Sequence, residues 1–312
     1  MNKDLNTTVV ALVTSFRPHQ WLKNAAVGAP AFFWGVFFDR VIFFKVLAAA
    51  LNFCILSSAI YLINDVFDIP RDRAHPLKKH RPIASGKISS QLALSVAAVI
   101  LGISFLVAYF LSFYYFAMIF SYALLQFAYN LFLRDVIILD ALAIALGFIF
   151  RVFAGALVIP VPVSSWFVLS TIGVSLLMAF GKRKSEKTIF PATADEGSYP
   201  TRRSLRNYPD TLLDSAISTF SAFTILSYSL FTFQTSPKTS LSANLLPATL
   251  AQPKWMMLTI PIVIYGISRY LYVIYEKREG ETPAKVLLAD TPLLLAVLFW
   301  IASVGAITYL LG

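Results

Sequence analysis

The chain has 312 residues, of which 58% are hydrophobic and 13% are charged, and its formal net charge is +10. Soluble domains carry about 25% charged residues, so this composition excludes an ordinary soluble protein and predicts an integral membrane protein. The single cysteine, Cys54, excludes an intrachain disulfide and a cysteine-based metal site.

Nine apolar runs approach the length of about 20 residues that a helix needs to cross a bilayer. They lie near 24–38, 46–64, 90–111, 114–133, 136–159, 164–181, 211–234, 255–275 and 286–311. The first run is short, and Pro30 favours a break in it. The predicted fold class is therefore all-α, a polytopic bundle of nine transmembrane helices forming a single domain over 1–312.

Lys and Arg residues between these runs fall mostly on one side of the predicted membrane, in the N-terminal segment and in the loops at 65–89, 182–210 and 276–285. The positive-inside rule makes these segments cytoplasmic and the C-terminus external, in an inner (plasma) membrane. Residues 1–16 lack a signal-peptide pattern and predict an amphipathic helix at the cytoplasmic interface.

The first polar motif, RPHQWLKN at 17–24, precedes and enters the first apolar run. Arg17, Gln20, Lys23 and Asn24 follow at i, i+3, i+6 and i+7, so they form a polar stripe on a helix. The spacing alone leaves two interpretations open. The basic side chains either extend toward lipid headgroups or bind an anionic substrate.

The second motif, NDVFDIPRDRAHPLKKHRPIASGK at 64–87, places three carboxylates at the end of an apolar segment. Asp65, Asp68 and Asp72 stand at i, i+3 and i+7, one face of a helix, which suits a hard cation such as Mg²⁺. Pro70 cannot continue a regular helix, so the position of Asp72 on that face stays open.

Basic residues crowd the same motif, and they could meet phosphate oxygens that a metal leaves uncovered. They are Arg71, Arg73, Lys78, Lys79 and Arg81. The alternative is a solvated acidic helix end that its own arginines neutralise.

Two arginines fall inside apolar runs, where charged residues are costly and usually functional. Arg151 follows Asp140 by eleven residues, about three helical turns, and so lies on nearly the same helix side. A structural Arg–Asp pair between helices is the alternative for Arg151. The role of Arg269 stays open. Farther on, FGKRKSE at 180–186 contributes Lys182 and Arg183, which an ordinary basic helix end would also explain.

Together these motifs resemble the UbiA superfamily of intramembrane prenyltransferases, whose aspartate-rich motif reads NDxxDxxxD. Within it, RPHQWLKN, DRAHPLKKHRPIASG at 72–86 and FGKRKSE are similar to the decaprenyl-phosphate phosphoribosyltransferase branch. The resemblance runs from about residue 15 to the C-terminus.

The resemblance implies a cytoplasmic-facing active-site cavity with one Mg²⁺ rather than two, because the usual second DxxxD motif is reduced to one acid, Asp140, which follows Tyr129 and the basic Arg134. Asp135 is then a solvated partner of Arg134. The implied metal ligands are Asp65, Asp68 and Asp72, which with Lys23 make the catalytic set. The implied substrate contacts are Arg17, Gln20, Asn24, Asn64, Lys78, Arg81, Tyr129, Arg134, Asp140, Arg151, Lys182 and Arg183.

The implied reaction transfers 5-phosphoribosyl from phosphoribosyl diphosphate to a polyprenyl phosphate of the decaprenyl type, as a precursor for a cell-envelope glycan. Two other functions are weighed against it. A conventional UbiA enzyme would move a prenyl group to an aromatic acceptor, and a transporter would carry anionic metabolites without chemistry. No nucleic-acid partner is expected, and association into a homo-oligomer stays open.

Overall fold

The structure, a computed structural model, describes residues 2–75, 78–159, 161–189, 205, 207–235, 254–277 and 283–310. Helices make up the whole of the secondary structure within these ranges. In chain order they are α1 (Asn2–Ser15), η1 (Pro18–Gly28), α2 (Ala29–Phe33), α3 (Arg40–Phe67), α4 (Ile69–Ala74), η2 (Lys78–His80), α5 (Ser90–Leu111), α6 (Phe113–Leu131), η3 (Leu133–Asp135), α7 (Leu139–Val158), α8 (Ser165–Ile189), α10 (Asp210–Thr235), η5 (Trp255–Thr259), α11 (Ile260–Tyr272), η6 (Val273–Lys277), α12 (Pro283–Ala289) and α13 (Thr291–Leu310).

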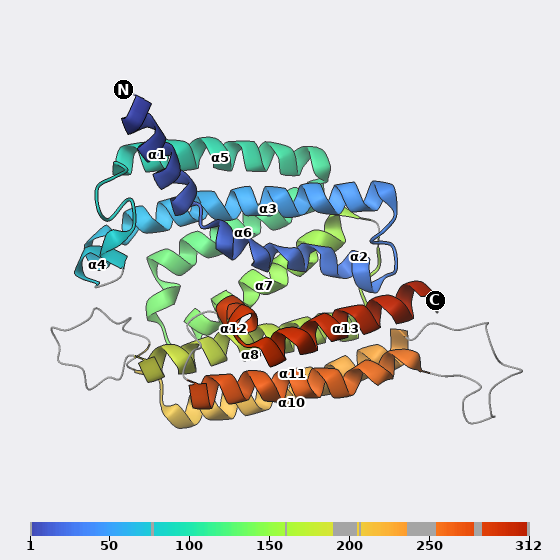
Figure 1. Cartoon of the computed structure of the whole chain (residues 1–312). Helices are drawn as coiled ribbons and strands as arrows, with labels where there is room; N and C mark the ends of the chain where they lie inside the picture. Colours follow the sequence, from blue (N-terminus) through green and yellow to red (C-terminus); the bar gives the residue numbers. More distant parts are fainter. Residues whose placement is uncertain are drawn as a thin grey trace, which may run out of the picture.

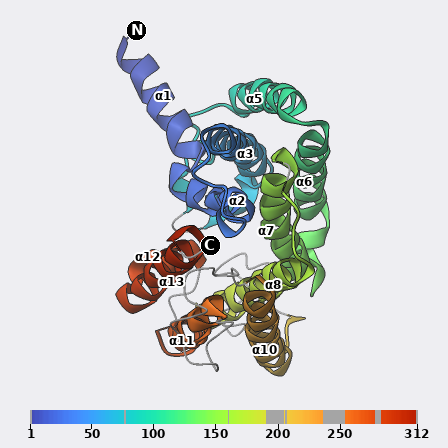
Figure 2. The same ribbon diagram turned by 90° about the vertical axis from the view of Figure 1, so that its right-hand side faces the viewer.

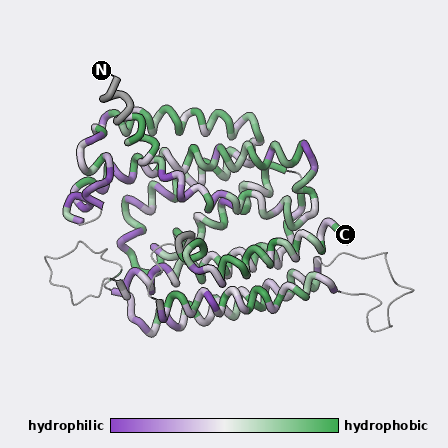
Figure 3. The backbone as a smooth tube through the Cα atoms, in the orientation of Figure 1, coloured by the Kyte–Doolittle hydropathy of each residue, from purple (hydrophilic) through white to green (hydrophobic). Residues whose placement is uncertain are grey.

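The long helices lie side by side and run between the two ends of the molecule (Figure 1). Viewed along their length they form a ring, with α3 and α5 opposite α10 and α11, and with α6 and α7 opposite α13 (Figure 2). Hydrophilic residues gather at the end where α4 lies, while the middle of the bundle is mostly hydrophobic (Figure 3). This pattern is typical of a bundle in a bilayer.

Seven of the described helices are long and apolar enough to cross a membrane, which confirms the membrane class. They are α3, α5, α7, α8, α10, the segment Trp255–Glu276, and α13. The run predicted at 24–38 is not one helix. The chain there is a 3-10 helix, η1, followed by the five-residue α2, which has Pro30 in its first turn, where a missing backbone N–H does no harm.

Large apolar side chains remain exposed on the outer face of α5, including Val99, Leu106 and Phe110, as expected for a surface that meets lipid. A helix, α1, occupies most of the segment 1–16 for which an interfacial helix is predicted. Its residue Ala11 packs against α3 and α5 in a cluster with Leu62 and Ala93.

The close packing of η1 on α7 depends on a glycine. A Cβ atom added to Gly155 would lie 1.8 Å from the carbonyl oxygen of Val27, so any side chain there would push η1 away from α7. This contact brings the polar stripe of η1 next to the inward face of α7. The first motif and Arg151 consequently belong to one site.

Candidate active site

The carboxylates of the second motif lie where α3 gives way to α4. Asp65 is in the last turn of α3, Asp68 follows the end of α3, and Pro70 occupies the first turn of α4. The helix is interrupted at Asp68. Asp65 and Asp72 flank this interruption seven residues apart, about two helical turns, and both are buried.

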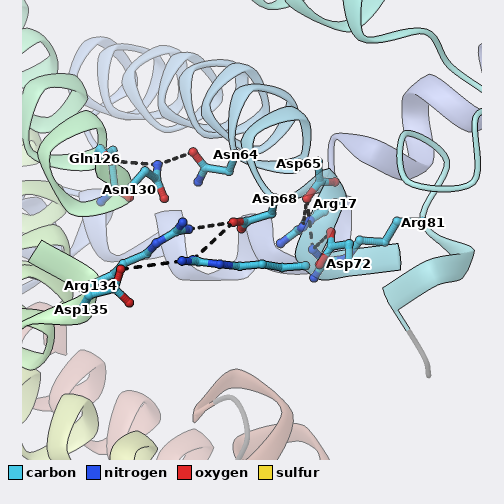
Figure 4. Close-up of polar contacts among 11 residues, drawn as sticks. Arg17, Asn64, Asp65, Asp68, Asp72, Arg81, Gln126, Asn130, Arg134 and Asp135 are labelled. Atoms are coloured by element: carbon cyan, nitrogen blue, oxygen red, sulfur yellow. Dashed lines mark hydrogen bonds and ion pairs between the residues drawn. The ribbon is translucent and has the colours of Figure 1, made fainter. Parts of the chain in front are cut away.

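One arginine joins Asp65 and Asp72. Nη1 of Arg81 lies 3.2 Å from Oδ1 of Asp65 and 2.7 Å from Oδ2 of Asp72 (Figure 4). Arg17 donates a second hydrogen bond to Asp65 from the start of η1, and its backbone is left-handed with φ 55°. The buried carboxylates of Asp65 and Asp72 therefore converge on the positively charged guanidinium group of Arg81.

Asp68 faces a different group. Nη1 of Arg134 donates to its Oδ1 at 2.8 Å (Figure 4). Nη1 of Arg71 lies 4.0 Å from the same oxygen. Asp135, expected to pair with Arg134, lies 3.8 Å from the guanidinium of Arg71. Arg71 is thus within 4.0 Å of both Asp68 and Asp135, a contact that the sequence could not indicate. A chain of alternating charges therefore joins α4 to η3.

Lys23 lies among other cations. Burial, with the like charges of Lys182, Arg151 and Arg17, lowers the pKa of Lys23 from 10.5 to about 7. Its nearest polar contact is Oε1 of Gln20, at 3.4 Å. An ammonium group in such surroundings favours an anion beside it, because a neighbouring negative charge would relieve the repulsion.

Arg151 lies deep in the bundle and is held by neutral partners. It donates to Oδ1 of Asn24 at 2.8 Å, to the hydroxyl of Tyr122 at 2.8 Å and to the carbonyl of Gly147 at 2.5 Å. Aromatic rings surround the guanidinium, with the centroid of Phe53 at 5.1 Å. Within the described part of the chain no ion pair joins Arg151 to Asp140 or to another carboxylate. It remains a positive charge beside the first motif.

Asp140 and Arg183 form a second, enclosed cluster. Nε of Arg183 lies 2.7 Å from Oδ2 of Asp140, and both side chains are 0% exposed. Tyr208 donates to Oδ1 of Asp140 at 2.5 Å, and Arg183 also donates to Tyr129 at 3.2 Å and to Glu186. Asp140 is therefore engaged by protein groups on both of its oxygens.

The sequence of this chain matches the UbiA prenyltransferase family over residues 24–301. The chain belongs to this family. The match begins within η1 and ends within α13, so it includes Asp65, Asp72, Arg81, Asp140 and Arg183, while Arg17 precedes it.

Curated relatives of this UbiA protein are similar along most of their length. A decaprenyl-phosphate phosphoribosyltransferase of Mycolicibacterium smegmatis is 32% identical over 96% of the chain and 93% of the relative. A protein of the same name from Mycobacterium tuberculosis is 32% identical over 96% and 94%, and one from Corynebacterium glutamicum is 30% identical over 96% and 87%.

Solved structures share the fold. A UbiA homologue from Archaeoglobus fulgidus bound to GPP and Mg²⁺ aligns with a TM-score of 0.68, covering 96% of this chain and 99% of that one, at 17% identity. Another structure, described as digeranylgeranylglyceryl phosphate synthase, aligns with a TM-score of 0.63 over 97% and 99%. This UbiA protein is therefore all-helical with the family's architecture.

The donor set of this UbiA protein suits a divalent ion in one place. No three His, Cys, Asp or Glu side chains converge as a metal cage in the described ranges. Mg²⁺, however, is commonly held by one or two carboxylates and completed by substrate phosphates and water. Asp65 and Asp72 fit this requirement, because both already direct an oxygen at the single nitrogen of Arg81.

Two polar residues of the site, Asn130 and Tyr122, were not predicted from the sequence. Nδ2 of Asn130 donates to the side-chain oxygen of Asn64, and the hydroxyl of Tyr122 accepts from Arg151 (Figure 4 shows the first pair). With Gln126 between them they repeat every four residues along α6. This polar stripe within an apolar run is a signal that could have indicated them.

Proposed function

We propose that this protein transfers the 5-phosphoribosyl group of phosphoribosyl diphosphate to a polyprenyl phosphate of the decaprenyl type, with Mg²⁺. The observation that carries the proposal is the similarity, at 30–32% identity over 96% of the chain, to relatives named decaprenyl-phosphate phosphoribosyltransferase. The concentration of cations around Lys23 supports it, because donor and acceptor together bring three phosphate-bearing groups into one site.

The donor's diphosphate would bind at the break between α3 and α4. Asp65 and Asp72 would hold Mg²⁺ there, and Arg17, Arg81 and Arg134 would contact the phosphate oxygens. Bound Mg²⁺ would supply charge neutralisation for the leaving diphosphate. Asp68, predicted as a third ligand, would instead orient Arg134 through their 2.8 Å contact. The remaining proposed contacts are Gln20, Lys23, Asn24, Asn64, Lys78, Tyr129, Arg151 and Lys182. Asp140 and Arg183, expected as contacts, are enclosed and would instead support the fold.

The reaction is a displacement at the anomeric carbon. An oxygen of the lipid phosphate forms a bond to C1 of the ribose, and the bond from C1 to the diphosphate oxygen breaks. The electron pair leaves with diphosphate, and the arginines that contact it stabilise the developing charge. The acceptor is already an anion near neutral pH, so no side chain has to remove a proton.

Orientation and access follow from the same proposal. The hydrophilic end, with α4 and η2, would face the cytoplasm, where the soluble donor is available. The N-terminus would then be cytoplasmic and the C-terminus external, with the run at 24–38 and α6 completing nine crossings. The polyprenyl tail would remain in the hydrocarbon, against an apolar groove between helices.

A conventional prenyltransferase is the second candidate, favoured by the fold shared with the homologue bound to GPP and Mg²⁺. The sequence identity is 17%, so the similarity supports a shared fold and not a shared activity. The enclosed Asp140, already bonded to Arg183 and Tyr208, disfavours a second metal site of the kind that paired aspartate motifs provide.

Diphosphate release separates the two candidates. The purified protein is incubated with Mg²⁺, phosphoribosyl diphosphate and decaprenyl phosphate, and in parallel with geranyl diphosphate and 4-hydroxybenzoate. We expect release only in the first mixture, and only when the lipid phosphate is present. Release in the second mixture alone would overturn the proposal.

A further inference from the structure

Tyr208 lies two residues before α10, and its hydroxyl connects that segment to the start of α7. The hydroxyl donates to Oδ1 of Asp140 at 2.5 Å and accepts from the backbone N–H of Ile138 at 2.8 Å. The side chain is almost completely buried. Burial and the Asp140 carboxylate raise the pKa of Tyr208, so the hydroxyl keeps the proton that it donates.

The start of α7 needs this partner. Ile138 is the residue that precedes the first turn, and an isoleucine side chain offers no oxygen to cap a helix. Its backbone has φ 70°, a conformation that is unfavourable for a β-branched residue and persists only when surrounding contacts impose it. The oxygen of Tyr208 holds the Ile138 amide in that conformation from outside the helix.

The turn at Ile138 connects α7 to η3, and η3 contains Arg134. Four residues before Ile138, Arg134 reaches Oδ1 of Asp68 at 2.8 Å. Tyr208 itself is fixed to α8 from its other side, because Nζ of Lys187 donates to its backbone carbonyl at 2.7 Å. Asp140 is fixed by Arg183 of the same helix at 2.7 Å. Movement of the turn is therefore restrained by α8 through Tyr208.

We propose that Tyr208 is a positioning residue: its hydroxyl fixes the turn between η3 and α7 and so keeps Arg134 facing Asp68, in place to contact the donor's phosphate. This inference rests on the proposed function only where it assigns a phosphate to Arg134. The restraint on the turn does not depend on that assignment.

The test removes one oxygen. Tyr208→Phe keeps the ring and deletes the hydroxyl. We expect amide hydrogen exchange over residues 136–142 to become at least about tenfold faster, because the Ile138 amide loses its acceptor. We also expect KM for phosphoribosyl diphosphate to rise about tenfold while KM for decaprenyl phosphate stays within about twofold.

Tyr309→Phe is the matched control. The hydroxyl of Tyr309 likewise accepts from a distant backbone N–H, that of Phe37 at 3.1 Å, and donates to the carbonyl of Phe32 at 3.1 Å. It lies on α13 near the C-terminus, at the end away from α4 (Figure 1). Its loss should leave exchange over 136–142 and both KM values at wild-type levels.

A double variant decides whether Tyr208 acts through Arg134. In an Arg134→Ala background, Tyr208→Phe should raise KM for the donor no further, because the side chain that it positions is gone. Additive effects, or a lower Tm with unchanged exchange over 136–142, would overturn the inference. If the wild-type protein transfers nothing from phosphoribosyl diphosphate, the proposed function fails, and the exchange measurement still tests Tyr208.

Discussion

Two aspartate–arginine clusters of this protein use the same chemistry in different surroundings. Around Asp65 and Asp72, the shared Arg81 side chain is 28% exposed, so solvent and solutes can reach it. Asp140 and Arg183 are both 0% exposed. A guanidinium that is accessible can exchange a carboxylate for a ligand, whereas an enclosed pair cannot separate without leaving a buried charge uncompensated. The first cluster is therefore suited to binding a ligand, and the second is suited to stabilising the fold.

Asp65→Asn is the variant that should break the first cluster most strongly. Turnover should fall about 10³-fold, because a charged ligand for the metal and its diphosphate is lost. The amide oxygen can still accept from Arg17 and Arg81, so Tm should remain near that of the wild type. Diphosphate release and thermal unfolding in detergent measure the two effects.

The matched control for this variant is Asp39→Asn. Asp39 caps α3 at its first turn, with Oδ1 accepting from Val41 and Ile42 at 3.0 Å, and asparagine caps helices equally well. Its activity should be that of the wild type. Should Asp65→Asn keep activity within tenfold, or should it fail to fold, the carboxylate is not part of the chemistry.

Asp140→Asn tests the enclosed cluster. We expect the free energy of unfolding to fall by about 3 kcal/mol, because the buried Arg183 guanidinium would lose one of its two carboxylates and keep only Glu186. The double variant Asp140→Asn with Arg183→Met should recover part of this loss, since the buried guanidinium is gone and Glu186 keeps its contact with Lys182. Denaturant titration in micelles measures both. A single variant as stable as the wild type would contradict the supporting role.

The protonation of Lys23 provides a pH test of anion binding at the proposed active site. Its pKa of about 7 means that the ligand-free protein holds this proton below pH 7 and has released it above. Binding of an anion restores the proton, so above pH 7 binding requires proton uptake and the Kd should rise about tenfold per pH unit. Sulfate is a suitable probe, because it does not titrate in this range.

Lys23→Arg is the control for the pH test, because a guanidinium stays charged throughout. Its sulfate affinity should be nearly independent of pH from about 6 to 8.5. If the wild-type affinity is equally flat, Lys23 is not beside the bound anion.

Arg71→Ala should have the smallest effect. The Arg71 side chain is 49% exposed, and its contacts with Asp68 and Asp135 are 4.0 Å and 3.8 Å long. Exposed ion pairs of this kind contribute less than about 1 kcal/mol. Denaturant titration should detect no larger change. A loss of several kcal/mol would show that the charge chain between α4 and η3 stabilises the fold.

Much of the fold was open to prediction, because transmembrane helices need long apolar runs and most of those runs became helices. The run at 24–38 was the exception. Its break depends on how η1 packs against α7 through Gly155, a contact between segments far apart in the sequence. Periodicity within one segment carries no information about such contacts.

The site was predictable in composition but not in pairing. The second motif indicated where acids and bases gather, and Pro70 pointed to an irregular helix. Which acid meets which base depends on the path of the chain after the break, so the pairing of Asp72 with Arg81 and of Arg134 with Asp68 required the structure. The contacts of Tyr208 could not be predicted for the same reason, since its partners precede it by 68 and 70 residues.

Transfer of labelled ribose into lipid tests the central claim most directly. The wild-type, Asp39→Asn and Asp65→Asn proteins are incubated with ribose-labelled phosphoribosyl diphosphate, Mg²⁺ and decaprenyl phosphate, and the organic phase is counted. We predict label in the lipid for the first two proteins and about 10³-fold slower labelling for Asp65→Asn. Folded wild-type protein that leaves all label in the aqueous phase would contradict the account.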